Sequence, residues 1–203
     1  MRPVSRLQRL RNLRNARGFT LVELMIVVAI IGVLAALAIY GVSKYLGAAK
    51  STEAKASLGA IGKGNIAAFN REYMSGAVLA DAAAAARSNQ ICGSAGATVP
   101  SSIANVTGKK YQSSAAEWAV DSIAGVGGGP KGFACLKFTL DSPHYYMYNY
   151  VGNGIDTATA TFTATATGDV DGDALTSLFE LEGATRDGRV VLAPTIKETN
   201  TEE

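Results

Sequence analysis

The sequence is poor in the residues that build most catalytic and metal sites. Its 203 residues include two cysteines, one histidine and one tryptophan. Two cysteines exclude a cysteine-dense small fold, and 22 glycines without a period of three exclude a collagen-like chain. No Ser/His/Asp, Cys/His or paired-carboxylate arrangement with a positioned base is evident, so we expect no enzymatic activity. A hydrophobic fraction of 48% excludes disorder along the whole chain.

Acidic residues are absent from the N-terminus. The first 18 residues contain six arginines, whereas the remaining residues carry 13 basic and 17 acidic side chains. The basic character therefore belongs to one short segment. A nucleic-acid-binding surface needs basic residues clustered on the folded part, so nucleic acid is not an expected partner.

Charge is also absent from residues 24–42. As a helix rising ~1.5 Å per residue, this run spans close to the ~30 Å of a bilayer core. The preceding arginines predict a cytoplasmic N-terminus, with the chain outside from Lys44 onward. The apolar run exceeds that of a secretory signal peptide. A plain signal anchor fits its length but gives no reason for Glu23, since a carboxylate in a span is costly and is by default a functional residue.

The residues from Arg17 to Gly32, RGFTLVELMIVVAIIG, closely resemble the class III signal of type IV pilins and of the related pseudopilins of type II secretion. The resemblance implies that a prepilin peptidase cleaves after Gly18 and methylates the new N-terminus at Phe19. It also implies that Glu23 is required for efficient methylation and for assembly. Many major pilins have proline where this chain has Tyr40, so opening of the helix there is in question.

A physical role for Glu23 follows from its position. Cleavage after Gly18 leaves an ammonium on Phe19, four residues before the carboxylate. In staggered parallel helices, two such charges about 4 Å apart attract by roughly 4 kcal/mol at an effective dielectric constant of ~20, before desolvation is subtracted. A helix out of register would bury both charges unpaired, so the pair would fix register.

The rest of the sequence predicts an α+β fold, in which a long N-terminal helix packs on an antiparallel β-sheet head. Apolar residues recur with helical spacing in the second half of a helix expected over residues 20–74. A short helix and a loop are expected over 75–116.

Strict alternation and aromatic runs predict strands, with an acidic frayed tail after them. The predicted strands are 133–140, 145–151 and 157–167, with a hairpin of 175–181 and 189–196, and the predicted tail is 197–203. The predicted segments are leader 1–18, membrane and filament-core helix 19–42, amphipathic helix 43–74 and head 75–203.

An acidic segment after the third strand has the spacing of an EF-hand-like calcium loop. Oxygen ligands would come from positions 1, 3, 5, 7, 9 and 12 of a twelve-residue frame. The position-6 glycine is replaced by Ala174, and flanking helices are not evident. A solvated Asp/Gly turn is the alternative. The candidate ligands are Asp169, Asp171, Asp173, the Leu175 carbonyl, Ser177 and Glu180.

Cys92 and Cys135 lie in the part of the chain expected to be exported. An oxidising compartment favours a disulfide between them, and two buried free thiols are the alternative. Zinc is not expected, because the two cysteines are far apart and there is one histidine. That histidine, His144, is interpreted as an ordinary turn residue.

These features predict a type IV pilin precursor, a structural subunit that assembles with copies of itself after processing. The alternatives are a pseudopilin of a periplasmic fibre and, from a different class, a membrane-anchored extracytoplasmic calcium-binding module. The expected partners are the prepilin peptidase, the inner-membrane assembly machinery and, before assembly, the membrane. The expected location is the bacterial inner membrane, followed by an extracellular pilus or a periplasmic fibre.

Overall fold

The computed structural model describes residues 18–71, 73–74, 87–121, 131–153 and 159–200. The leader and the helix expected near residues 75–86 lie outside these residues. The chain divides into two compact units, 1–45 and 46–203. Each unit is described by itself.

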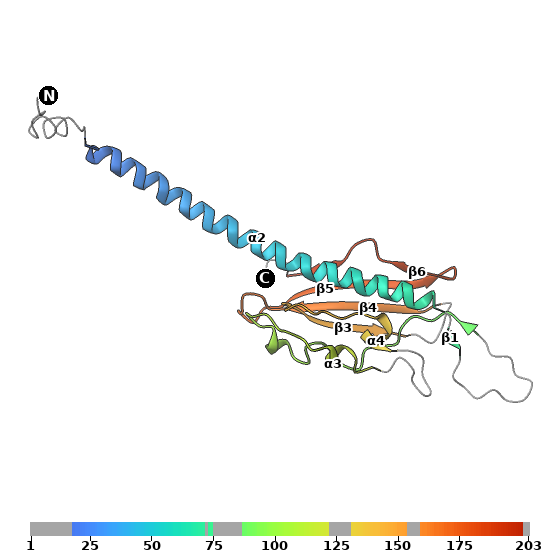
Figure 1. The fold of residues 1–203 in the computed structure, drawn as a ribbon. Coiled ribbons are helices and arrows are strands. Elements are labelled where there is room, and N and C mark those ends of the chain that lie inside the picture. The colour runs from blue at the N-terminus through green and yellow to red at the C-terminus, as the bar shows by residue number, and fades with distance from the viewer. Residues whose placement is uncertain (1–17, 72, 75–86, 122–130, 154–158, 201–203) are drawn as a thin grey trace, which may run out of the picture. The chain divides into compact units, whose positions relative to one another are not determined.

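Helix α2, Leu21–Phe69, dominates the N-terminal third (Figure 1). The predicted helix over residues 20–74 is therefore confirmed, although it ends five residues early. It continues through Gly32 and Gly41 without a break, so the Tyr40-Gly41 pair does not open it in the single chain. In the first unit, every described side chain is exposed.

The part of α2 in the second unit buries one side. Ala54, Leu58 and Ile61 are fully buried, and Phe69 is nearly so. These positions recur at three- and four-residue intervals, which places them on one face of a helix. Gly62 lies on the same face, where an added Cβ would stand 3.0 Å from a Leu181 methyl group. The amphipathic pattern in the sequence therefore predicted the packed face correctly.

The head contains a five-stranded antiparallel sheet. Its strands run in the order β3-β4-β5-β6, and β7 pairs with another part of β5. Asp187 and Gly188 form the β5–β6 turn, with φ angles of 49° and 71°, as a two-residue type I′ hairpin requires. The predicted antiparallel sheet is confirmed. The strands are β3 Met147–Gly152, β4 Thr161–Gly168, β5 Ser177–Arg186, β6 Arg189–Leu192 and β7 Lys197–Thr199; β1 Tyr73–Met74 and β2 Arg87–Ser88 form a separate pair.

Two sequence predictions about the head were wrong. A strand was expected over residues 133–140, but the first part of this segment belongs to helix α4, Gly132–Leu136, which is capped by Lys137 with a left-handed φ of 52°, and residues 138–140 form no strand. A short apolar run fits a buried strand or a buried helical turn equally well, and here the helical turn places Phe133 against Trp118. Residues 197–199 belong to β7 rather than to a frayed tail.

Strand β7 escaped prediction because its side chains carry no burial pattern. All three are exposed, and the strand is held by backbone pairing with β5. Two ion pairs reinforce it, Lys197–Glu180 at 2.7 Å and Glu198–Lys55 at 2.9 Å. Exposed pairs of this kind add about 0–1 kcal/mol each, so the ladder is the main attachment.

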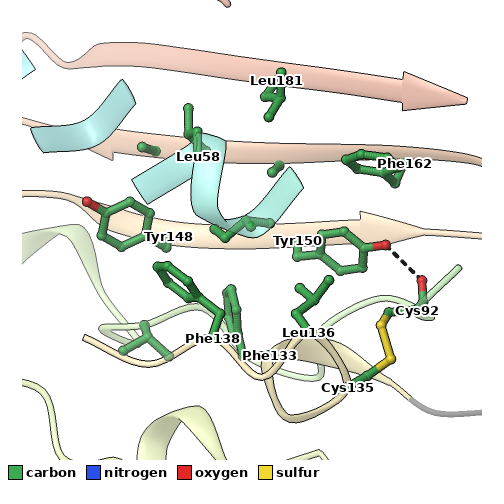
Figure 2. Packing of buried hydrophobic residues seen from close by; sticks show 14 of the residues in the cluster. Leu58, Cys92, Phe133, Cys135, Leu136, Phe138, Tyr148, Tyr150, Phe162 and Leu181 are labelled. Atoms are coloured by element: carbon green, nitrogen blue, oxygen red, sulfur yellow. Dashed lines mark hydrogen bonds between the residues drawn. A yellow bond between two sulfur atoms is a disulfide. The ribbon is translucent and has the colours of Figure 1, made fainter. Parts of the chain in front are cut away.

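Large and small residues alternate across the sheet, and the large side chains Tyr150, Phe162 and Leu181 are among the buried ones drawn in Figure 2. In one cross-strand row Ala164 lies between Tyr150 and Leu181, which leaves room above the alanine. The next row is inverted, with Phe162 between Gly152 and Gly183. A Cβ on Gly183 would stand 2.3 Å from the Phe162 ring, so only glycine fits beside it. Two short helices complete this unit, the 3-10 helix η2 Ile103–Asn105 and α3 Ala115–Trp118.

His144 was expected to be an ordinary turn residue, but it forms an isolated antiparallel bridge with Tyr111 before β3 and is 1% exposed. Its Nδ1 lies 2.7 Å from the Tyr146 carbonyl oxygen, an arrangement that suits a neutral ring donating from Nδ1. The rings of Tyr111 and Tyr148 contact it at centroid distances of 5.8 and 5.5 Å. Burial lowers the pKa of His144, and the carboxylates of Glu53 and Glu117 oppose this effect only in part.

The histidine predicts how the stability of the head depends on pH. Because its folded pKa is lowered, its contribution is fully present above the unfolded value of about 6.5 and is lost as pH falls below it, by at most about 1.4 kcal/mol per pH unit. Urea unfolding between pH 7.5 and 5.5 measures the slope. His144→Gln should flatten the slope over this range. An equally steep slope in that variant would contradict the assignment.

Candidate functional site: the start of helix α2

Glu23 has local hydrogen-bond partners in the single chain. The Thr20 backbone N–H donates to Glu23 Oε2 at 2.9 Å, and the Thr20 hydroxyl donates to the same oxygen at 2.8 Å. In return, the Glu23 backbone N–H donates to Thr20 Oγ1 at 3.2 Å. This reciprocal arrangement is a capping box, with threonine at the N-cap and glutamate at the third helical position. The carboxylate therefore closes the start of α2.

A functional role was expected for Glu23 but not for Thr20. The signal was present, because threonine followed three residues later by glutamate before an apolar run is a helix-start pattern. Both bonds that Glu23 accepts from Thr20 end on Oε2. A carboxylate has about four lone-pair sites, so Oε1 retains the capacity to accept from a further donor.

The residues expected to be processed lie immediately before this cap. Gly18 and Phe19 are outside α2 in non-helical backbone, and the Phe19 side chain is 87% exposed. A peptidase needs its target bond in accessible backbone, and residues 18–20 are exposed and outside the helix. Cleavage after Gly18 would place the new amine one residue before Thr20. The expected cleavage point, the cap and the acid thus lie within residues 18–23.

An apolar surface follows the cap. The large hydrophobic side chains of residues 19–46 are all between 46% and 87% exposed. A soluble monomer rarely exposes a contiguous apolar patch larger than a few hundred Å². Helix α2 is long and apolar enough to cross a membrane. This surface therefore requires lipid or other helices around it.

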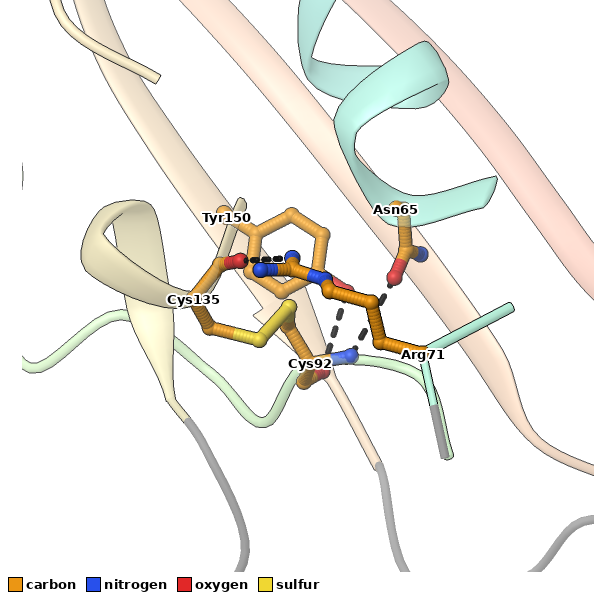
Figure 3. Close-up of a disulfide and its surroundings, with 5 residues drawn as sticks. All are labelled: Asn65, Arg71, Cys92, Cys135 and Tyr150. Atoms are coloured by element: carbon orange, nitrogen blue, oxygen red, sulfur yellow. Dashed lines mark hydrogen bonds between the residues drawn. A yellow bond between two sulfur atoms is a disulfide. The ribbon is translucent and has the colours of Figure 1, made fainter. Parts of the chain in front are cut away.

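The second group of predicted residues, Cys92 and Cys135, forms a disulfide, as predicted (Figure 3). Asn65 and Arg71, near the end of α2, reach this bridge. The Asn65 side-chain oxygen accepts from the Cys92 N–H at 3.1 Å, and Arg71 Nη2 donates to the Cys135 carbonyl at 2.6 Å. From β3, the Tyr150 hydroxyl donates to the Cys92 carbonyl at 2.9 Å. Pairing was predictable from the sequence, but these three side chains were not, because they come from distant segments.

The acidic loop only partly matches the predicted calcium frame. Asp169, Asp171 and Asp173 place carboxylate oxygens within 4.8 Å of one another, which suits a hard cation with oxygen ligands. The carboxylates also accept backbone N–H groups of the loop, at Gly172, Asp173 and Leu175. These bonds equally satisfy the alternative, an Asp/Gly turn.

Two of the remaining predicted calcium ligands, Ser177 and Glu180, make other contacts. The Ser177 hydroxyl donates to the Gly168 carbonyl at 3.0 Å. Glu180 pairs with Lys197 and lies opposite Thr165 in the ladder, three residues along β4 from Gly168, or about 10 Å. The last four positions of the twelve-residue frame, from Ser177 onward, belong to strand β5 rather than to a loop. The three aspartates fit a cation, and calcium binding stays a prediction.

The capping box predicts the effect of substitutions at Thr20. Thr20→Ala removes both side-chain hydrogen bonds and should weaken the first turn of α2 by about 1 kcal/mol, whereas Thr20→Ser keeps the hydroxyl. Amide hydrogen exchange of residues 21–24 in the full chain, held in lipid nanodiscs, measures the fraying. Faster exchange is expected in the alanine variant alone, and equal exchange in both variants would refute the cap.

The disulfide predicts a large loss of stability on removal. The bridge closes a sequence separation of 43 residues. In the chain-entropy model this corresponds to about 4 kcal/mol. The double variant Cys92→Ser, Cys135→Ser should therefore unfold at much lower urea concentration. Dithiothreitol should lower the stability of the wild type toward that of the double variant, and should not change the variant itself.

The chain has no significant match among curated proteins or among solved structures. One family model matches it, the prokaryotic N-terminal methylation motif, at residues 13–39. The matched range contains the expected cleavage point, the capping box and much of the exposed apolar helix. The chain therefore carries the class III signal of type IV pilins and pseudopilins at its N-terminus.

Proposed function

We propose that this protein is a type IV pilin precursor, a structural subunit that polymerises into a filament after cleavage and methylation. One observation carries the proposal. Within the methylation motif, an exposed apolar helix bears a single carboxylate, one turn after the expected cleavage point. The role is structural, not enzymatic: the helix forms the filament core and the disulfide-linked head forms its surface.

Assembly begins with the chemistry at the N-terminus. Hydrolysis of the Gly18–Phe19 peptide bond releases the leader and leaves an amine on Phe19, which methylation keeps positively charged. The capping box holds the Glu23 carboxylate at the start of α2 through Oε2. The ammonium of a neighbouring copy can then approach Oε1. The resulting pair stabilises one stagger between helices, because any other stagger buries two unpaired charges.

The apolar surface explains how the span can leave the bilayer. In lipid, the exposed side chains of α2 contact acyl chains; in a filament, they contact the same side chains of other copies. The hydrophobic contribution is nearly equal in the two environments, so the helix can move between them at modest cost. Close packing and the Phe19–Glu23 pair then favour the filament.

A second candidate within the same class is a pseudopilin of a periplasmic type II secretion fibre. The convergence of Asp169, Asp171 and Asp173 favours it. Some major pseudopilins hold calcium in a C-terminal loop, and the three aspartates would supply oxygen ligands for such an ion. Both candidates share the same processing and assembly chemistry. A membrane-anchored binding module is the remaining alternative, and it would not be cleaved after Gly18.

The decisive experiment compares the wild type with Glu23→Ala and Glu23→Gln. Loss of the charge should reduce incorporation into sheared surface fibres by at least about tenfold, since the pair at stake is worth more than about 1.4 kcal/mol. Membrane insertion should be unchanged in all three proteins. Glu23→Gln retains a side-chain acceptor for Thr20, so it separates the loss of the charge from the loss of the cap.

Intact-mass measurement of the membrane and fibre fractions supplies the control. The mature wild type should lack residues 1–18 and gain about 14 Da at Phe19 for one methyl group. A mature form that still begins at Met1, or full fibre incorporation of Glu23→Ala, would overturn the proposal. Processed protein in fibres that remain in the periplasm would favour the pseudopilin.

A further inference from the structure

Two basic side chains contact one aromatic ring in the second unit, and a third lysine is adjacent to one of them in the sequence. Lys50 comes from α2, and Lys109 and Lys110 come from the loop after η2. The Nζ atoms of Lys50 and Lys110 each lie 4.8 Å from the centroid of the Tyr145 ring. These four residues are called the lysine–tyrosine cluster below. Lys109 and Lys110 are exposed, and Lys50 and Tyr145 are half-buried.

The backbone around the cluster is fixed by hydrogen bonds. Tyr111 and His144 exchange two backbone hydrogen bonds, both 2.9 Å long, which hold the two loops side by side. The Tyr145 N–H donates to Glu53 Oε1 at 3.3 Å and ties these loops to α2. The lysines are therefore presented together rather than scattered. Lys50 and Lys110 each gain a cation–π attraction, but two like charges on one ring repel, so an external anion lowers their free energy.

Negative groups lie close to the cluster and shorten the distance over which its lysines attract anions. Glu53 is one of them. The acidic loop is another, since Gly108 packs on Gly172, where an added Cβ would stand 3.6 Å from the Gly172 Cα. Asp171 and Asp173 on that loop are exposed. The cluster therefore lacks the broad positive field that would attract a distant polyanion, and an anion must already be near it to bind.

The position of the cluster along the chain places it near lipid headgroups. Lys50 follows the last residue of the uncharged run, Val42, by eight positions. Between them lie Lys44 and Tyr45, and Tyr40 is in the final turn of the run. Tyr40 and Tyr45 are 66% and 72% exposed. Tyrosine and lysine at the end of a span are typical of the headgroup region of a bilayer, where the tether raises the local concentration of lipid headgroups.

We propose that the lysine–tyrosine cluster binds anionic phospholipid headgroups and holds the head on the membrane surface while the subunit waits for assembly. This inference rests on the membrane-anchored precursor proposed above. The ammonium groups of Lys50, Lys109 and Lys110 contact lipid phosphate, and the Tyr145 ring keeps two of them in place. Extraction of the helix into a filament removes the headgroups and releases the cluster.

Lysine footprinting of the full-length chain tests this contact. The protein is placed in nanodiscs of phosphatidylcholine alone, or of phosphatidylcholine mixed with phosphatidylglycerol. Each lysine is then acylated briefly and quantified by mass spectrometry. Phosphatidylglycerol should slow acylation of the three cluster lysines about threefold to fivefold at low salt, and high salt should reverse the effect. Lys63 and Lys137 are exposed on the same unit and serve as internal references.

Variants separate the cluster from general attraction to the membrane. The double variant Lys109→Gln, Lys110→Gln should abolish the phosphatidylglycerol-dependent protection of Lys50, and Tyr145→Ala should weaken the protection of the remaining lysines. Lys63→Gln should change nothing. Equal acylation in both membranes, or equal slowing of Lys63 and Lys137, would overturn the proposal. Cleavage after Gly18 should be normal in every variant, so failure here is distinguishable from failure of the pilin assignment.

Discussion

The constraint on which the rest of this structure depends is an apolar helix that cannot remain uncovered. Residues 19–46 expose nearly all of their hydrophobic side chains. Water is excluded as their stable environment, so lipid and the helices of other copies are the two environments that remain. In the proposed function, the helix moves from the first of these environments to the second, and N-terminal processing prepares it for that transfer.

The acid at the start of the helix makes the transfer specific. The free energy of apolar packing alone changes little with the stagger between helices, because one methyl group replaces another. A buried carboxylate makes the free energy depend on the stagger, since it needs a hydrogen-bond donor wherever it lies. In the single chain Thr20 provides that donor. Under the proposed function, the remaining capacity of the same carboxylate accepts the amine of a second copy.

Sequence patterns predicted the features that depend on local periodicity. The span, the buried face around Leu58, the alternating strand around Ala164 and the last hairpin were all visible in short windows. Features that depend on distant contacts were not visible. Helix α4 is settled by the packing of Phe133 on Trp118, and β7 by a backbone ladder that leaves no side-chain pattern. The hydrogen bonds of Asn65 and Arg71 to the disulfide-linked segments join residues that are distant in the sequence, so no short window shows them. In the acidic loop, residue types predicted three converging aspartates but could not show that Glu180 lies on a strand.

The contacts of α2 with the disulfide have a mechanical consequence. Asn65 lies on the last turns of the helix and Arg71 follows its end, and they hydrogen-bond to the backbone of Cys92 and Cys135 respectively. A tensile load carried along the helix thus passes into a covalent cross-link that joins two separate stretches of the head. Shear against the sheet is shared with that link, so peeling the head from its stalk requires several bonds to fail together. A fibre made of such subunits would resist pulling at the subunit level.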